Sequence, residues 1–421
     1  MKRAVNRQPF LPILAGSDPN AGQDRRNSTI DASYALALEK ATANRGSLSS
    51  AEVATLLTPN RSTEEMMLWQ AAHGLRLATT GKCIHLRAII EFSNYCRQDC
   101  LYCGLRRSNG RIARYRMTPD EMVQTAIKAH RLHEFGTFVL QSGEDPSYPP
   151  EDLELAVHGI KKATGAAVTL SIGEMPTENY RALREAGADR FLLKFETSDA
   201  ELFRKLKPST TLAHRLGCLN SLRKMGYQIG SGIILGLPGQ NLGSIASDLL
   251  LCRDEDYEMV SIGPFIPHPD TPLGSVSHET AHPMTPDAGP VLAATASVRS
   301  TITAVAVARL LVPHAHMPAT TALGVIGKRD DAWRKMIPNL RDARSLALVA
   351  GANVVMLDVT PAKYRACYSI YPGKSEADGD VILESIRQAQ ADIRTLKMTI
   401  CPGRGDSPKP PWGRGNTNVE R

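Results

Sequence analysis

The sequence predicts an α/β protein whose main part is a (β/α)8 TIM barrel, with an N-terminal helical extension and disordered tails. Eight short apolar runs alternate with helical patterns between residues 83 and 374, as a parallel barrel requires. The rival architecture, an open doubly wound sheet, is disfavoured because no G-x-G-x-x-G turn follows the first run. Glycines also close four helices just before a strand, at Gly165, Gly187, Gly226 and Gly351.

The pattern divides the chain into four segments. The first is polar, and we expect it to be poorly ordered, with about the first 30 residues disordered or loosely docked. The last ends in a Pro/Gly-rich stretch that we expect to be disordered from Cys401 onward. In chain order the segments are an N-terminal extension (1–48), N-terminal helices (49–82), the barrel (83–374) and a C-terminal helix with its tail (375–421).

Capping signals and periodicity place the individual elements. Ser49 or Ser50 caps a helix over 51–57, and a second helix covers about 62–79. The run Thr118-Pro119-Asp120-Glu121 is a capping box with proline at the first helical position, and that helix should end at Gly136. A last amphipathic helix covers 380–396. The expected strands are 84–92, 137–141, 167–171, 190–195, 228–235, 259–263, 311–319 and 353–357.

Composition favours a cytoplasmic protein without a membrane or nucleic-acid partner. The chain has 421 residues, 42% hydrophobic and 22% charged, which is ample for a large core. Its net charge of +7 comes from scattered basic residues, and no Lys/Arg run is interleaved with aromatics. No apolar run could span a bilayer, and the stretch 10–15 is too short for a signal peptide. The eight cysteines are then expected to be metal ligands or buried thiols rather than disulfides.

Three cysteines share one loop directly after the first predicted strand. Cys96, Cys100 and Cys103 have the spacing C-x3-C-x2-C, and thiolates are the natural ligands of iron–sulfur clusters. Three ligands can hold three irons of a 4Fe-4S cluster and leave the fourth iron open. A zinc site would need a fourth ligand nearby, and inert core cysteines fit poorly among Arg, Gln and Asp. We therefore assign the three cysteines as metal ligands and catalytic residues.

Polar residues follow the other predicted strands, at the end where barrels place their chemistry. Glu196 ends an apolar strand, where a carboxylate is costly unless hydrogen-bond donors surround it. Plainer interpretations stay open: Gly143-Glu144 as an ordinary turn, Glu196 as a helix cap, Arg215 as a surface arginine and His268 as a structural histidine. Three tyrosines near the end of the barrel either wall the cavity or pack a closing helix: Tyr364, Tyr368 and Tyr371.

These motifs resemble the radical S-adenosylmethionine (SAM) superfamily. The cysteine loop with an aromatic residue, Tyr102, before its last cysteine is the superfamily's signature. The resemblance implies a 4Fe-4S cluster whose open iron binds S-adenosyl-L-methionine, with Glu144 near its amino group, Glu196 near its ribose and Arg215 near its carboxylate. The residues that correspond to SAM contacts are Tyr102, Ser142, Gly143, Glu144, Ser171, Glu196 and Arg215.

Residues 50 to 375 are similar to one branch, the HydE family of FeFe-hydrogenase maturases. The segments S-I-G-P-F-I-P-H-P-D-T-P-L and P-A-T-T-A-L-G carry much of that similarity. The biotin synthase and methylornithine synthase families match these segments less well. The resemblance implies radical chemistry on a small sulfur-containing or iron-bound cysteine substrate, an electron donor such as flavodoxin or ferredoxin, and other hydrogenase maturases as partners. The expected substrate contacts are Lys194, Thr320, Thr321, Met356 and Tyr364.

The chain departs from that family at three places. Lys194-Phe195-Glu196-Thr197 stands where R-H-E-T is common, so a lysine replaces an arginine and loses its planar fork. Met356-Leu357-Asp358 stands where M-P-N is usual and adds a carboxylate. The C-terminal cysteine cluster of some members is missing, since only Cys401 follows Lys374. A paralogue with another small substrate, or a methylornithine synthase-like or biotin synthase-like enzyme, is therefore the alternative.

Other classes of protein fit the sequence less well. An iron–sulfur electron carrier would not need the polar strand ends, and a zinc-dependent hydrolase would need His and Asp ligands that are scarce here. A nucleic-acid-modifying enzyme would usually carry an added basic domain. The remaining cysteines of the barrel are expected to be buried thiols: Cys83, Cys218, Cys252 and Cys367.

Overall fold

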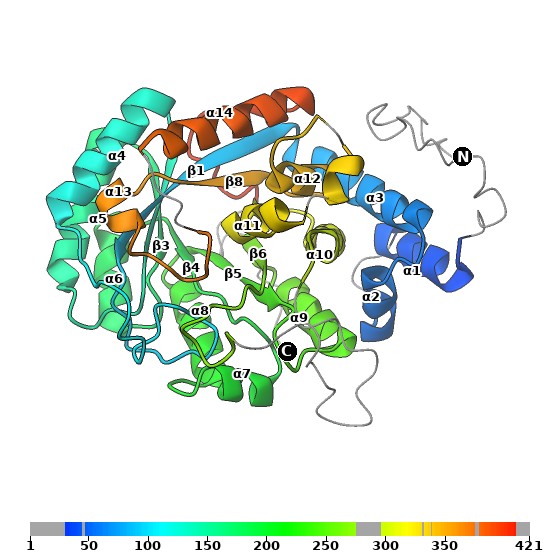
Figure 1. Ribbon diagram of the computed structural model, residues 1–421, viewed down its shortest axis with the longest axis horizontal. Coiled ribbons are helices and arrows are strands. Elements are labelled where there is room, and N and C mark those ends of the chain that lie inside the picture. The colour runs from blue at the N-terminus through cyan, green and yellow to red at the C-terminus, as the bar shows by residue number, and fades with distance from the viewer. Residues whose placement is uncertain are drawn as a thin grey trace.

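The computed structural model describes residues 30–43, 47–274, 296–330, 332–337, 339–374 and 379–409. In these residues a parallel sheet curls into a barrel with helices on its outside (Figure 1), in the strand order β6-β5-β4-β3-β2-β1-β8-β7. The predicted barrel is confirmed. The strands are β1 (Cys83–Ser93), β2 (Thr137–Ser142), β3 (Ala167–Ser171), β4 (Arg190–Leu192), β5 (Gln228–Leu235), β6 (Met259–Pro264), β7 (Pro318–Ala319) and β8 (Val354–Asp358).

The two edge strands meet at the N-terminal end of the barrel. His316, two residues before β7, pairs in parallel with Met259 of β6. The N–H of Val260 donates to the His316 carbonyl at 2.9 Å, and the N–H of His316 donates to the Glu258 carbonyl at 2.8 Å. This short backbone contact closes the ring of strands at its base.

The helices that cover the strands begin where capping residues indicate. Thr118 accepts the N–H of Glu121 at 3.2 Å, and the Glu121 carboxylate accepts the N–H of Thr118 at 2.9 Å, so the predicted capping box is confirmed. The covering helices are α4 (Pro119–His133), α5 (Pro150–Thr164), α6 (Thr177–Glu185), α7 (Ala200–Leu206), α8 (Leu212–Lys224), α9 (Leu242–Asp254), α10 (Val298–Leu311), α11 (Thr321–Arg329), α12 (Ala343–Val349), α13 (Ala362–Arg365) and α14 (Gly379–Thr395).

Three predicted boundaries are wrong by three residues or more, and one of them is the end of β4, which lies at Leu192 rather than Phe195. Helix α4 ends at His133 rather than Gly136, because Glu134 takes the left-handed conformation (φ 54°) that terminates it. The apolar run from Leu311 to Ala319 contributes only its last two residues to β7. Its first residue is the end of α10, a helix buried on all sides, and a fully buried helix cannot be told from a buried strand by periodicity.

Three N-terminal helices pack beside α9 and α10 (Figure 1): α1 (Ala32–Ala43), α2 (Ser50–Leu57) and α3 (Ser62–Thr80). The prediction that residues 1–48 are poorly ordered is wrong for α1. This helix buries Tyr34, Ala37, Leu38 and Ala41. The burial of these apolar side chains offsets the conformational entropy that is lost when the helix is ordered. Residues 1–29 lie outside the described residues. No helix in the described ranges combines the length and hydropathy that a bilayer crossing needs.

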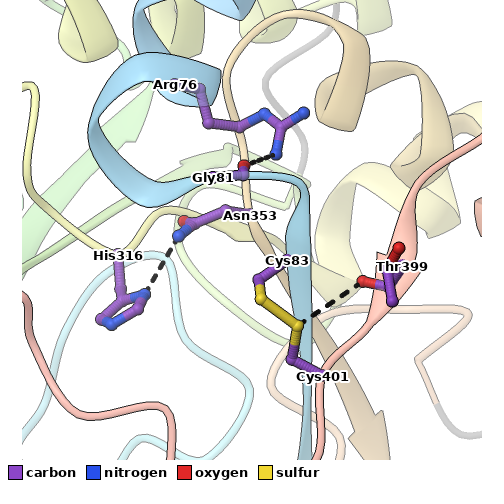
Figure 2. The surroundings of a disulfide bond; sticks show 7 residues. All are labelled: Arg76, Gly81, Cys83, His316, Asn353, Thr399 and Cys401. Carbon is purple, nitrogen blue, oxygen red and sulfur yellow. Dashed lines mark hydrogen bonds between the residues drawn. A yellow bond between two sulfur atoms is a disulfide. The ribbon is translucent and has the colours of Figure 1, made fainter.

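The C-terminal segment returns to the base of the barrel. Strand β9 (Thr399–Ile400) pairs in parallel with the first residues of β1, which brings the Cα atoms of Cys83 and Cys401 to 5.3 Å. The two residues form a disulfide (Figure 2), so the prediction of a free buried thiol at Cys83 is wrong. Cys218 and Cys252 are buried free thiols as predicted, whereas Cys367 is only partly buried.

The residues after the disulfide form a strap across the base of the barrel. Asp406 pairs with the buried guanidinium of Arg190 at 2.7 Å, and Arg404 pairs with Asp189 at 2.6 Å. The prediction of a disordered tail is therefore wrong for residues 401–409, because two ion pairs and a strand contact hold them. Residues 410–421 lie outside the described residues.

Candidate active site

A cavity of about 350 Å³ opens at the C-terminal ends of the barrel strands. It brings together residues from the cysteine loop and from most of the strand ends. Those predicted from the sequence that line it are Cys96, Cys100, Cys103, Tyr102, Ser142, Gly143, Glu144, Ser171, Lys194, Glu196, Arg215, Thr320, Thr321 and Met356.

Tyr364 is the predicted site residue that the structure places elsewhere. Its hydroxyl lies 2.6 Å from the Glu121 carboxylate on α4, and its ring stacks on Tyr115. The two tyrosines that follow it, Tyr368 and Tyr371, do line the cavity.

Two polar side chains fix the shape of the cysteine loop. The Asn94 amide donates to the carbonyls of Ala113 and Cys367 at 2.7 and 2.8 Å. The Arg114 guanidinium donates to carbonyls on both sides of the cysteines, including Asn94 and Leu105. Because these donors satisfy loop carbonyls that no strand can reach, the loop holds one conformation around its three thiols.

The three thiols sit in a low-dielectric environment. Burial raises the pKa of Cys96 to about 11 and raises the pKa of Cys103 further. A thiol so placed releases its proton when a positive centre, such as an iron of a cluster, binds the sulfur. Lys207 adds a positive charge 3.3 Å from the Cys100 sulfur, and the N–H of Glu144 lies 3.4 Å from the Cys96 sulfur. These donors suit thiolate ligands.

The three cysteines of the loop lie along one part of the cavity. Among the described residues, no group of three or more His, Cys, Asp or Glu is arranged to hold a single metal ion. The loop cysteines share one cavity wall, which fits a cluster with one iron for each cysteine.

Gly143 allows the loop after β2 to press against the cysteine loop. A Cβ atom at this position would lie 2.2 Å from the Tyr95 carbonyl oxygen and 2.8 Å from the Cys96 Cβ. A glycine is therefore required for the close approach that carries Glu144 to the cysteines.

Glu144 belongs to a buried ion-pair network. One of its oxygens lies 3.2 Å from Arg215, and the other accepts the Gln98 amide at 2.6 Å. Arg215 also contacts Glu174 at 2.8 Å. Burial alone would raise the pKa of Glu144, but Arg215, Lys207 and Gln98 outweigh it and hold that pKa below its ordinary value. The cavity thus keeps an ionised carboxylate next to the cysteine loop.

Glu196 has a strained backbone and an unsatisfied acceptor. Its φ is +66°, a region that non-glycine residues seldom adopt. Its N–H donates to Gly232 at 3.0 Å, and its carbonyl accepts the N–H of Ile234 at 3.1 Å, so the β5 strand holds it there. The buried Oε2 accepts no hydrogen bond from the described residues, although the Lys194 ammonium lies 3.2 Å away. An acceptor in this state suits hydroxyl groups of a bound molecule.

Further polar groups of the cavity lie around Gly263, next to Lys194. A Cβ placed on Gly263 would lie 3.9 Å from the Thr320 hydroxyl and 4.0 Å from the Lys194 ammonium. The Thr321 and Tyr371 hydroxyls lie 2.6 Å apart. Asp358, by contrast, does not add a free charge to the cavity, because its Oδ2 lies 3.5 Å from Lys374.

Sequence reasoning missed Lys207 and Gln98. Lys207 follows α7 in a Lys-Pro pair that reads as a surface turn, and only the fold brings its ammonium to Cys100. Gln98 stands between two cysteines, and nothing in the sequence indicates that it, rather than Arg97 or Asp99, enters the cavity. His268, for which the sequence left both a ligand or base role and a structural role open, has its Nε2 at 3.1 Å from the Ser369 hydroxyl.

Comparisons with known proteins found similarity over most of the chain. Residues 90–252 match the model of the radical SAM superfamily. The chain is 46% identical to the FeFe-hydrogenase maturase subunit HydE of Thermotoga maritima over 309 residues, which make up 73% of this chain and 79% of that protein. It is 28% identical to 3-methylornithine synthase of Methanosarcina acetivorans over 86% of this chain and 91% of that protein. The crystal structure of a methylornithine synthase matches with a TM-score of 0.67 at 25% identity, over 87% of this chain and 97% of that one.

Proposed function

Because the chain belongs to the radical SAM superfamily and, within it, to the HydE family, we propose that it acts in assembly of the FeFe-hydrogenase active site. The observation that carries this proposal is the cavity itself, where three cysteines of one loop face polar groups from the strand ends. The 46% identity to a HydE protein supports the same assignment.

The cysteines define where the cofactors bind. Cys96, Cys100 and Cys103 would hold the 4Fe-4S cluster through their thiolates, and a cluster with three protein ligands would have one iron free for SAM. When bound, the cluster and SAM supply a carbon-centred radical, after one electron splits the SAM sulfonium. Apolar side chains such as Ile89, Leu193 and Phe265 line the cavity beside the polar groups and would limit the water that reaches such a radical.

The neighbouring residues give SAM its orientation. Glu144, kept ionised by Arg215, accepts the amino group, and Glu196 accepts ribose hydroxyls through its unsatisfied oxygen. Arg215 and Lys207 supply positive charge for the carboxylate. The walls of this half of the cavity are Tyr102, Ser142, Gly143 and Ser171.

The part of the cavity around Gly263, next to Glu196, takes the substrate. Lys194 and Thr320, which both approach Gly263, suit a small molecule with an anionic group, and Thr321 and Met356 line the same region. Lys194→Arg should keep activity because the charge remains, whereas Lys194→Met should lose it. Equal activity of the two variants would remove Lys194 from the substrate site.

A maturation assay tests the assignment. Apo-hydrogenase and the other maturases would be incubated with this protein in place of HydE, with reductant and SAM. We expect hydrogenase activity to appear, and the Cys100→Ser protein serves as the matched control. Failure to activate the hydrogenase, with SAM cleavage intact, would reject the maturase assignment.

A second candidate is an enzyme like methylornithine synthase. The lysine at position 194, where HydE proteins commonly have arginine, favours a different anionic substrate. Incubation with L-lysine and SAM, followed by mass spectrometry for methylornithine, separates this candidate from the first.

A further inference from the structure

The outer surface of the cysteine loop is strongly basic. Between residues 94 and 116 the loop holds six arginines and one acidic residue, Asp99. Arg97 and Arg107 are exposed and line one surface groove. The C-terminal end of α7 adds Arg204 and Lys205, both exposed. We call these four residues, Arg97, Arg107, Arg204 and Lys205, the basic rim.

The basic rim lies directly over the cysteines. The N–H of Arg107 donates to the Gln98 carbonyl at 2.8 Å, and the N–H of Leu101 donates to the Leu206 carbonyl at 2.9 Å. The second bond joins the end of α7 to the middle of the loop. Two residues beyond Lys205, Lys207 reaches the Cys100 sulfur. A protein that touches the rim is therefore separated from the cluster site by little more than this loop.

Three of the four rim residues form no ion pair within the described part of the chain. Elsewhere on the loop Arg106 pairs with Asp99, Arg111 with Asp270 and Arg116 with Asp145. Arg97 has a long contact of 3.4 Å to Glu144. Arg107, Arg204 and Lys205 form no ion pair with any described residue. Asp99 attracts Arg107 but is itself paired with Arg106, so most of the positive charge of the rim is available to a partner.

We propose that the basic rim docks the one-electron donor, a small acidic protein that carries a flavin or an iron–sulfur cluster. This inference rests on the proposed function, because only a cluster behind the loop needs an electron delivered there. Electron transfer requires close approach, and opposite charge on the two surfaces speeds the encounter. A nucleic acid is the other common polyanion, but the groove beside the rim is lined without Phe, Tyr or Trp on which bases could stack.

The test reverses the charge of two rim residues and compares the rate of cluster reduction by a protein reductant with the rate for a small-molecule reductant. The double variant Arg107→Glu/Lys205→Glu would be reconstituted without oxygen and mixed with photoreduced flavodoxin in a stopped-flow instrument. We expect cluster reduction at least about tenfold slower than in the unaltered protein, whose rate should fall as salt is added. Reduction by photoreduced 5-deazariboflavin, and the SAM cleavage that follows it, should be unchanged, because this small uncharged molecule needs no docking surface.

Arg131→Glu/Lys162→Glu is the matched control, since both residues are exposed in the last turn of a helix, α4 or α5, and carry the same charge change. Its reduction by flavodoxin should be normal. Equal slowing in this control would show a general charge effect and overturn the docking site, as would unaltered flavodoxin reduction of the rim variant. If the rim variant lost only affinity for RNA, the surface would be a nucleic-acid site instead. Absence of SAM cleavage by the unaltered protein with 5-deazariboflavin would reject the proposed function rather than the docking site.

Discussion

One carboxylate oxygen of Asp248, on α9, accepts hydrogen bonds from both the backbone N–H and the hydroxyl of Ser198, at 2.5 and 2.6 Å. The same oxygen lies 3.3 Å from the Thr197 hydroxyl. These bonds hold the two residues that follow Glu196, where the backbone has its positive φ. A fully buried carboxylate thus fixes the turn that aims Glu196 into the cavity.

Asp248→Asn should weaken SAM binding at least about fivefold, which corresponds to about 1 kcal/mol. The new amide would face the Gln240 amide, now 3.5 Å from Oδ2, and two donors would oppose each other. Cluster content should stay normal because no cysteine is touched. Calorimetric titration of SAM and an iron assay measure the two effects, with Ser247→Ala on the exposed side of α9 as control. Normal SAM affinity in the Asn variant would show that Asp248 does not position Glu196 for SAM binding.

The same residue predicts a pH dependence of stability. Burial raises the pKa of Asp248 to about 7 from an ordinary 3.8. Between these values the folded chain holds a proton that the unfolded chain has released, so stability falls as pH rises through this window. Relative to Asp248→Asn, the free energy of unfolding should drop by on the order of 4 kcal/mol from pH 4 to pH 7 and then level off. Urea unfolding of both proteins at several pH values measures this change. An unaltered protein that gains stability relative to Asp248→Asn as the pH rises would contradict the assignment.

Two substitutions at Glu196 should distinguish the effect of its backbone strain on stability from the effect of its carboxylate on SAM binding. Both Glu196→Ala and Glu196→Gly remove the carboxylate, so both should lose SAM affinity. Glycine accepts a φ of +66° without strain, and Glu196→Gly should therefore be about 1 kcal/mol more stable than Glu196→Ala. Urea unfolding and SAM titration together distinguish these effects. An alanine variant that binds SAM as the unaltered protein does would remove Glu196 from the SAM site.

The Cys83–Cys401 disulfide should stabilise the strap at the base of the barrel. Cys401→Ser in thiol-free buffer should lower stability by about 2–4 kcal/mol, because the bridge restricts the unfolded chain. In a reducing buffer the variant and the unaltered protein should have the same melting temperature. Cys367→Ser, which alters a free cysteine, serves as the control. A Cys401→Ser protein with an unchanged melting temperature in both buffers would show that the strap is held by its ion pairs alone.

Local signals in the sequence were sufficient to predict most of the fold and the cysteine loop. The capping box at Thr118 and the glycines before strands act over a few residues, so they can be read without a structure. The spacing of Cys96, Cys100 and Cys103 is equally local. The polar strand ends at Glu144 and Glu196 were predictable because parallel strands direct their C-terminal ends to one mouth.

The features that the sequence did not indicate depend on contacts between distant residues. Cys83 and Cys401 are 318 positions apart, and only the pairing of β9 with β1 brings them together. Lys207 reaches Cys100 because α7 ends against the cysteine loop. Tyr364 was expected in the cavity from its place near Tyr368 and Tyr371, but the short helix α13 turns it toward Glu121 instead.

Chromatography with mass spectrometry of 5′-deoxyadenosine and methionine tests the central claim most directly. The protein would be reconstituted with iron and sulfide without oxygen, reduced and mixed with SAM. We predict both products from the unaltered protein and neither from Cys100→Ser. Product formation by the Cys100→Ser protein, or a single zinc ion held by the three cysteines in the unaltered protein, would contradict the account.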